Sequence, residues 1–136
     1  MSDLKPELSK RNKWHISKHK YLELKHYCLQ YPEWKKSYAE LLAVRSHVNL
    51  HQHVQTSKLQ DTTSHIAIML TDYKNRMEMI ERTANLADPV IGAYILKAVT
   101  EEYSFNYLKM QMDIPCERDM YYDRYRKFFW LLSKER

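Results

Sequence analysis

The sequence predicts an all-α protein, and both composition and spacing support this class. The 136 residues include only one Gly and four Pro, so the chain lacks the turn residues that normally separate short β-strands. Hydrophobic residues make up 44% and charged residues 29%, which is enough apolar material for a core. Apolar residues also recur at intervals of three and four positions, as on one face of a helix. We therefore expect an N-terminal helical hairpin, a long helix and a C-terminal trihelical helix-turn-helix.

Positive charge is concentrated near the N-terminus. The net charge is +5, and residues 1–26 carry seven Lys or Arg against three Asp or Glu, whereas residues 101–136 carry seven of each. Residues 1–16 are therefore expected to form a flexible basic arm, which suits an anionic surface such as a phosphate backbone. The candidate contacts in this arm are Lys10, Arg11 and Lys13. The alternative is a solvated tail without a partner.

A helical hairpin is predicted for residues 17–45. Its first helix spans about Ser17 to Gln30. Pro32 ends this helix and can start the second one, because a proline disfavours helical geometry in the residue before it but fits the first turn of a helix. Residues 46–63 are polar and lack a sustained period, so we expect a linker there.

A long helix is predicted from about Ser64 to Leu86. Its apolar residues are spaced alternately by four and three positions, as in a heptad repeat. These residues are Ile66, Leu70, Tyr73, Met77, Ile80, Ala84 and Ala87. The stripe could join two copies in a homodimer through residues 64–87, or it could pack within its own chain. Tyr73 and the alanines make a poor zipper and favour packing within the chain.

The remaining residues complete a predicted domain over residues 64–136. Asp88-Pro89 is typical of a helix start, and Ser104 is placed to cap a short helix. A tight turn then leads through Pro115 into a last helix from about Cys116 to Ser133. A short helix, a turn and a longer helix form the plan of a helix-turn-helix, in which the last helix lies in the DNA major groove.

The last helix has two predicted faces. Apolar side chains recur with helical spacing on the core face, at Tyr121, Tyr125, Phe128 and Leu132. The opposite side and its flanks carry donors suited to guanine and phosphate, at Arg118, Tyr122, Arg126 and Lys127. Ser104 and Asn106, at the start of the preceding helix, are candidate phosphate contacts.

Two stretches resemble known regulators. DPVIGAYILKAVTEEYSFNYLKMQMDIPCERDMYYDRYRKFFWLL is similar to the region-4-like helix-turn-helix of sigma factors and, more closely, to the C-terminal part of phage regulators of the RinA/ArpU type. LKHYCLQYPEWKKSYAELLA is similar to the N-terminal helices of those regulators. The resemblance covers most of the chain. It implies a prophage-type transcriptional regulator that binds double-stranded DNA in the cytoplasm of a bacterial host. The connection IPCERDMYYD is longer than the family's usual turn and lacks its Ser or Thr cap.

A protein-interaction module is the main alternative. Aromatic residues are frequent at interface hot spots, and Phe129 and Trp130 are expected away from the core side of the last helix. Such a module would bind RNA polymerase, a sigma factor or a DNA-packaging enzyme without reading DNA itself.

Other functions have less support from the sequence. One Gly excludes enzymes whose glycine-rich loops hold phosphates, and no catalytic motif stands out, so we expect neither an enzyme nor a cofactor. Two cysteines do not make a disulfide framework. The spacing of His47, His51 and His53 would suit zinc, but no acidic or cysteine ligand lies in that stretch, so no metal site is expected. Without a signal peptide or an apolar span, a cytoplasmic protein with no membrane contact is expected.

Overall fold

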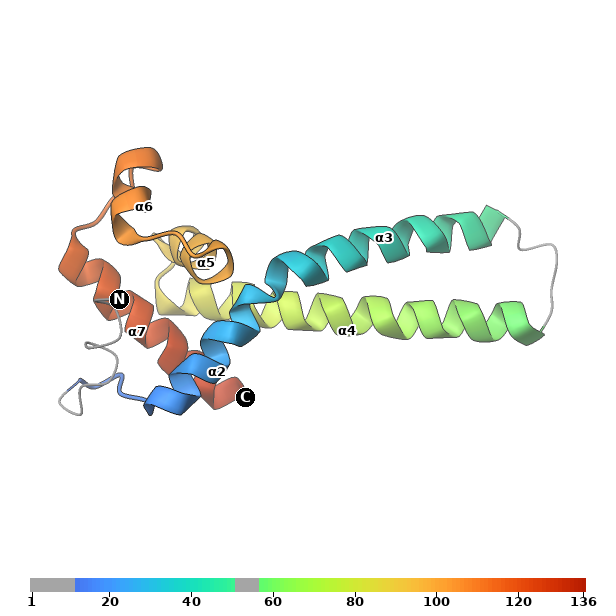
Figure 1. Ribbon diagram of the computed structural model, residues 1–136, viewed down its shortest axis with the longest axis horizontal. Coiled ribbons are helices and arrows are strands. Elements are labelled where there is room, and N and C mark those ends of the chain that lie inside the picture. Colours follow the sequence, from blue (N-terminus) through green and yellow to red (C-terminus); the bar gives the residue numbers. More distant parts are fainter. Residues whose placement is uncertain (1–11, 51–56) are drawn as a thin grey trace. The chain divides into compact units, whose positions relative to one another are not determined.

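The computed structural model describes residues 12–50 and 57–136. This part of the chain contains six helices and no strand, which confirms the all-α class (Figure 1). The helices are α2 (Lys18–Leu29), α3 (Tyr31–Leu50), α4 (Ser57–Ala87), α5 (Gly92–Glu101), α6 (Phe105–Gln111) and α7 (Arg118–Glu135).

The chain divides into two compact units. The first, here called the terminal unit, combines Met1–Gln30 with Met79–Arg136. The second, the middle unit, is Tyr31–Glu78. Helix α2 therefore belongs to the terminal unit and α3 to the middle unit, while α4 contributes residues to both.

The middle unit consists of α3 and the first part of α4, which run in opposite directions (Figure 1). Its buried side chains include Trp34 of α3 and Ile66, Leu70 and Met77 of α4. The Arg76 guanidinium lies 5.7 Å from the Trp34 ring centroid, a cation–π contact between the two helices. A helical hairpin is present, but it is formed by α3 and α4 and not by residues 17–45.

Most of the predicted linker at residues 46–63 is helical, so that prediction was wrong. Helix α3 extends to Leu50 and α4 begins at Ser57, which leaves only residues 51–56 outside the described part of the chain. The stretch contains neither Gly nor Pro. Polar residues without a helix breaker can continue a helix on its solvent side, so polarity alone does not predict a break.

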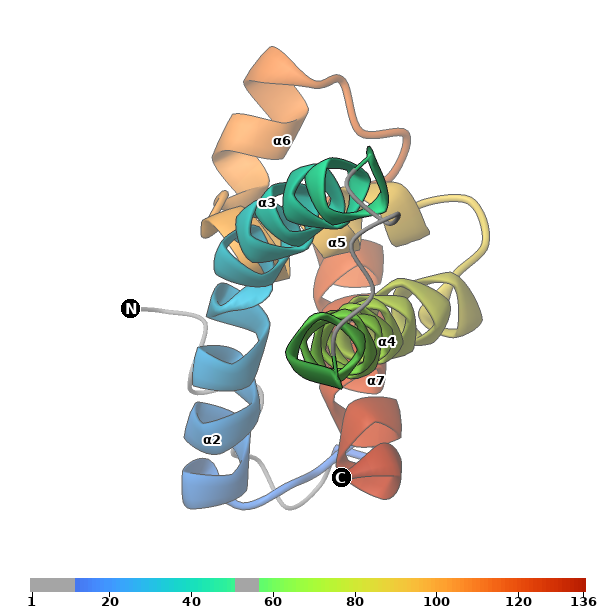
Figure 2. The same ribbon diagram turned by 90° about the vertical axis from the view of Figure 1, so that its right-hand side faces the viewer.

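In the terminal unit, α2 packs against α5 and α7, and α5 also contacts α6 and α7 (Figure 2). The deepest side chains come from several helices and are fully buried, among them Leu24, Ile80, Ile95, Phe128 and Leu132. The apolar face of α2 lies against α7: the Tyr21 ring meets Phe129 edge-on at 5.0 Å, and its hydroxyl lies 3.0 Å from that of Tyr125. The apolar face of α2 is therefore covered within the terminal unit, by α7.

The predicted heptad stripe of α4 is buried within its own chain. Of its seven members only Tyr73 is half-buried, and the others are at most 9% exposed. A homodimer through residues 64–87 would need this stripe to be free. The predicted alternative, packing within the chain, is what the structure contains.

The last three helices follow the predicted order. Ser104 caps α6 as expected, since its hydroxyl accepts a hydrogen bond from the Tyr107 N–H at 3.1 Å. The connection from α6 to α7 is longer than the predicted tight turn and occupies residues 112–117. Within it, Asp113 has a φ of 51°, and the buried Ile114 donates its backbone N–H to the Leu108 carbonyl.

Candidate nucleic-acid interface

The outer face of α7 carries polar and basic residues on one line. At about 100° per residue, this face contains Asp119, Asp123, Arg126, Lys127, Trp130 and Lys134. Trp14, from the segment before α2, lies on the same face. Its indole N–H donates a hydrogen bond to Asp123 Oδ1 at 3.2 Å, and its ring lies 5.1 Å from that of Trp130. The end of the predicted basic arm is therefore attached to α7.

Three lysines surround these two rings. Lys13 and Lys127 place their ammonium groups 4.9 and 5.5 Å from the Trp14 ring centroid, and Lys134 lies 4.5 Å from that of Trp130. We call Lys13, Trp14, Lys127, Trp130 and Lys134 the Trp14 patch. Each ammonium group is attracted to the face of a neighbouring ring. Because the two rings contact each other, the three positive charges lie close together on the surface.

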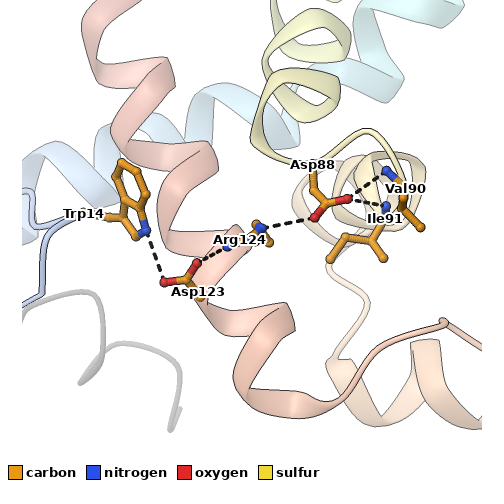
Figure 3. A network of polar contacts seen from close by, with 6 residues as sticks. All are labelled: Trp14, Asp88, Val90, Ile91, Asp123 and Arg124. Atoms are coloured by element: carbon orange, nitrogen blue, oxygen red, sulfur yellow. Dashed lines mark hydrogen bonds and ion pairs between the residues drawn. The ribbon is translucent and has the colours of Figure 1, made fainter.

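A polar network fixes the position of Asp123 beneath the patch (Figure 3). Its second carboxylate oxygen accepts a hydrogen bond from Arg124, and Arg124 Nε donates to Asp88 Oδ2 at 3.1 Å. Asp88 Oδ1 accepts the backbone N–H groups of Val90 and Ile91 at 2.7 and 3.1 Å. The network thus connects Trp14, α7 and the turn before α5.

The charges in this network are stabilised in the folded protein. Burial alone would raise the pKa of Asp88, but its two backbone donors and the Arg124 guanidinium outweigh burial and hold that pKa below its ordinary value. The hydrogen bond to Asp88 in turn raises the pKa of Arg124. Arg124 is shared by the two carboxylates of Asp88 and Asp123, so this network keeps one net negative charge next to the three positive charges of the patch lysines.

Five of the predicted DNA contacts, namely Lys13, Lys127, Asn106, Arg118 and Tyr122, are divided between this patch and a second cluster. Lys13 and Lys127 belong to the patch. Arg118 and Asn106 belong to the second cluster, where Arg118 Nη2 donates to Asn106 Oδ1 at 2.9 Å. The guanidinium of Arg118 also lies 5.3 Å from the Phe105 ring and 5.7 Å from that of Tyr122. This cluster joins the start of α6 to the first turns of α7.

The remaining predicted contacts are placed differently. Arg126 is half-buried, and its Nε is buried without a hydrogen-bond acceptor among the described residues. The Ser104 hydroxyl caps α6. Lys10 and Arg11 lie outside the described residues, as do His51 and His53, while His47 is exposed on α3.

The prediction that Phe129 faces away from the core was wrong. Its side chain is 1% exposed and contacts the rings of Tyr21, Tyr125 and Phe128 at 5.0–5.1 Å. The buried face of α7 is one residue wider than the predicted spacing of four and three positions suggested, because α2 also packs against it. Trp130 is half-buried under Trp14. Sequence reasoning missed Trp14, although a tryptophan in an otherwise polar basic arm was a signal that the arm is anchored.

Both thiols are poor nucleophiles. Burial raises the pKa of Cys28 far above its ordinary value and also raises that of Cys116. In the described part of the chain, no group of three or more His, Cys, Asp or Glu side chains is placed to hold a metal ion. The helices of that part also include none with a stretch sufficiently long and apolar to cross a membrane.

No protein family, no curated protein and no solved structure matches this chain.

Proposed function

We propose that this chain is a DNA-binding protein that contacts the phosphate backbone of duplex DNA through the Trp14 patch. The carrying observation is that Lys13, from the N-terminal segment, and Lys127, from α7, lie over the same Trp14 ring at 4.9 and 5.5 Å. Two basic elements that are far apart in the sequence thereby form one positive surface. Lysines grouped in this way release counterions when they meet phosphates, which is the main source of nonspecific affinity for DNA.

Other basic residues support the proposal. Arg126 lies on the same face of α7, and Lys10 and Arg11 precede Lys13 in the sequence. Arg118 is exposed, and its bond to Asn106 uses only part of the five N–H donors of a guanidinium. In this proposal the patch supplies affinity, and Arg118 with Tyr122, at the first turns of α7, supplies base contacts. The resemblance to RinA/ArpU-type regulators supports a role in transcriptional control of phage or prophage genes.

The test is duplex binding measured by fluorescence anisotropy across a salt series. Replacing Lys13, Lys127 and Lys134 together with Ala should weaken binding and lower the slope of log K against log salt by about 0.9 for each phosphate that is no longer neutralised. Lys97→Ala is the matched control, because Lys97 is an exposed lysine of the same unit that pairs with Glu101 at 3.1 Å. The proposal is wrong if the wild-type protein does not bind duplex DNA at low salt, or if the triple variant keeps the wild-type slope.

A protein-binding role is the second candidate, and exposed apolar side chains on α6 support it. Met110 is 80% exposed and Tyr107 43% exposed, whereas Phe129, one of the two residues predicted for this role together with Trp130, is in the core. Exposed apolar side chains that lie together are typical of interaction surfaces. Loss of in vivo activity in a Tyr107→Ser/Met110→Ser variant that still binds DNA with full affinity would favour this role.

A further inference from the structure

A cavity of about 210 Å³ lies in the terminal unit between α2, α5 and α7. The turn from α5 to α6 closes one side of it, and it is partly open to solvent. It shares no residue with the Trp14 patch. Its volume is smaller than the range typical of drug-sized ligands, so it would suit a molecule with a single ring.

Aromatic side chains form much of the cavity wall. Phe105 of α6 and three residues of α7 line it, namely Tyr121, Tyr125 and Phe129. These rings contact one another, with centroids 5.2 Å apart for Phe105 and Tyr121 and 5.1 Å apart for Tyr125 and Phe129. Such a wall favours an aromatic ring, which can meet it edge-on or offset.

The cavity is also lined by polar groups that could bind the charged end of a ligand, namely Lys25 and Ser104. Lys25 of α2 lines the cavity, is half-buried, and forms no ion pair with the described residues. Other lysines of the same unit do form ion pairs: Lys20 with Glu23, and Lys97 with Glu101. Ser104 also lines the cavity, and since its oxygen accepts the Tyr107 N–H, its own O–H remains able to donate.

We propose that this cavity binds a small aromatic carboxylate, a function separate from DNA binding. The ring would lie against Phe105 and Tyr125, and the carboxylate would accept hydrogen bonds from the Lys25 ammonium and the Ser104 hydroxyl. A charge-assisted hydrogen bond to a half-buried lysine is stronger than a hydrogen bond between neutral groups. The cavity should therefore bind a carboxylate more tightly than a neutral ligand with the same ring. Glu102, which also lines the cavity, is exposed at the turn; its carboxylate repels anions, and this repulsion increases with each further negative charge on the ligand.

The test is a titration of the full chain with phenylacetate, in which binding is monitored through the NMR spectrum of the protein. Benzyl alcohol is the neutral probe and phenethylamine the cationic one. A ligand of this size is expected to bind with a dissociation constant on the order of 1 mM. Lys25→Met should weaken phenylacetate binding about tenfold and leave benzyl alcohol unchanged. Lys18→Met, an exposed lysine on the same helix that does not line the cavity, is the matched control.

Ala98→Leu fills the cavity from α5 and should abolish binding of both phenylacetate and benzyl alcohol. If that variant does not fold, the wild-type spectra decide, since phenylacetate should shift the resonances of Phe105 and Tyr125. The proposal is overturned if phenylacetate does not saturate the wild-type protein, if its shifts lie elsewhere, or if phenethylamine binds more tightly than phenylacetate. None of these outcomes depends on whether the chain binds DNA.

Discussion

The indole N–H of Trp14 donates a hydrogen bond to the carboxylate of Asp123 at 3.2 Å, across a separation of 109 residues. This bond attaches the segment before α2 to the outer face of α7. It places Lys13 beside Lys127, which the sequence separates by more than a hundred positions. The basic surface proposed to bind DNA therefore depends on this attachment.

Replacing Trp14 with Ala should detach the segment. The ring is half-buried against Trp130, so its loss should lower the free energy of unfolding by about 1–3 kcal/mol, as measured by urea denaturation. Trp14→Phe keeps a smaller aromatic ring against Trp130 but loses the N–H, and it should cost less than Trp14→Ala, about 0.5–1.5 kcal/mol. Equal stability of the Ala variant and the wild-type protein would show that the segment is not held in solution.

The Asp88 carboxylate should make stability depend on pH. Its pKa is below its ordinary value of 3.8 in the folded protein, so the folded state favours the charged form. The stabilisation is therefore complete above the unfolded pKa and is lost as pH falls through the folded one. Asp88→Asn should cost about 1–3 kcal/mol at pH 7, because Arg124 loses one of its two charged partners.

Urea denaturation of both proteins between neutral and acidic pH checks this prediction. The difference in stability between Asp88→Asn and the wild-type protein should shrink below pH 3.8. Asp72→Asn is the control, since Asp72 is an exposed aspartate of α4. A difference for Asp88→Asn that stays constant over this range would contradict the assignment of a lowered pKa.

Periodicity and capping residues made much of the terminal unit predictable. The core positions of α7 at Tyr121, Tyr125, Phe128 and Leu132 are all buried, because apolar residues spaced by four and three positions lie on one side of a helix. The Ser104 cap was predictable because its hydroxyl accepts a hydrogen bond from the backbone N–H only three residues later, at Tyr107. Both signals are local in the sequence.

Long-range contacts were not predictable in the same way. Nothing in residues 17–45 shows that α2 packs on α5 and α7, since its apolar face would suit any helical partner. Likewise, the pattern of α7 alone predicts a solvent-exposed outer face, and only the fold brings Trp14 onto it. The burial of Phe129 is a consequence of α2 lying beside α7, so it too depends on a contact between distant segments.

Glu102→Gly should stabilise the protein. Glu102 ends α5 in the left-handed conformation, with a φ of 61°, which glycine adopts without the steric cost of a Cβ. We expect a gain of about 0.5–1 kcal/mol in the free energy of unfolding, measured by urea denaturation. Ala67→Gly, at an exposed helical position of α4, is the control and should instead destabilise by about 1 kcal/mol.

Gly92→Ala should destabilise the protein, although alanine is the better helix former by about 1 kcal/mol. Gly92 is the only glycine of the chain and begins α5. A Cβ there would lie 2.8 Å from the Ala84 carbonyl oxygen and 3.0 Å from Asn85 Oδ1. The backbone oxygen cannot move aside as a flexible side chain could, so the start of α5 must shift away from α4, at a cost of about 1–3 kcal/mol.

Gly92→Ala/Asn85→Ala separates the two contacts. Removing the Asn85 side chain relieves only the contact at 3.0 Å, so the double variant should remain less stable than Asn85→Ala alone. Thermal and urea unfolding of the four proteins measure this directly. If Gly92→Ala raises stability, helix propensity outweighs the close approach, and the start of α5 does not lie as near to α4 as these distances require.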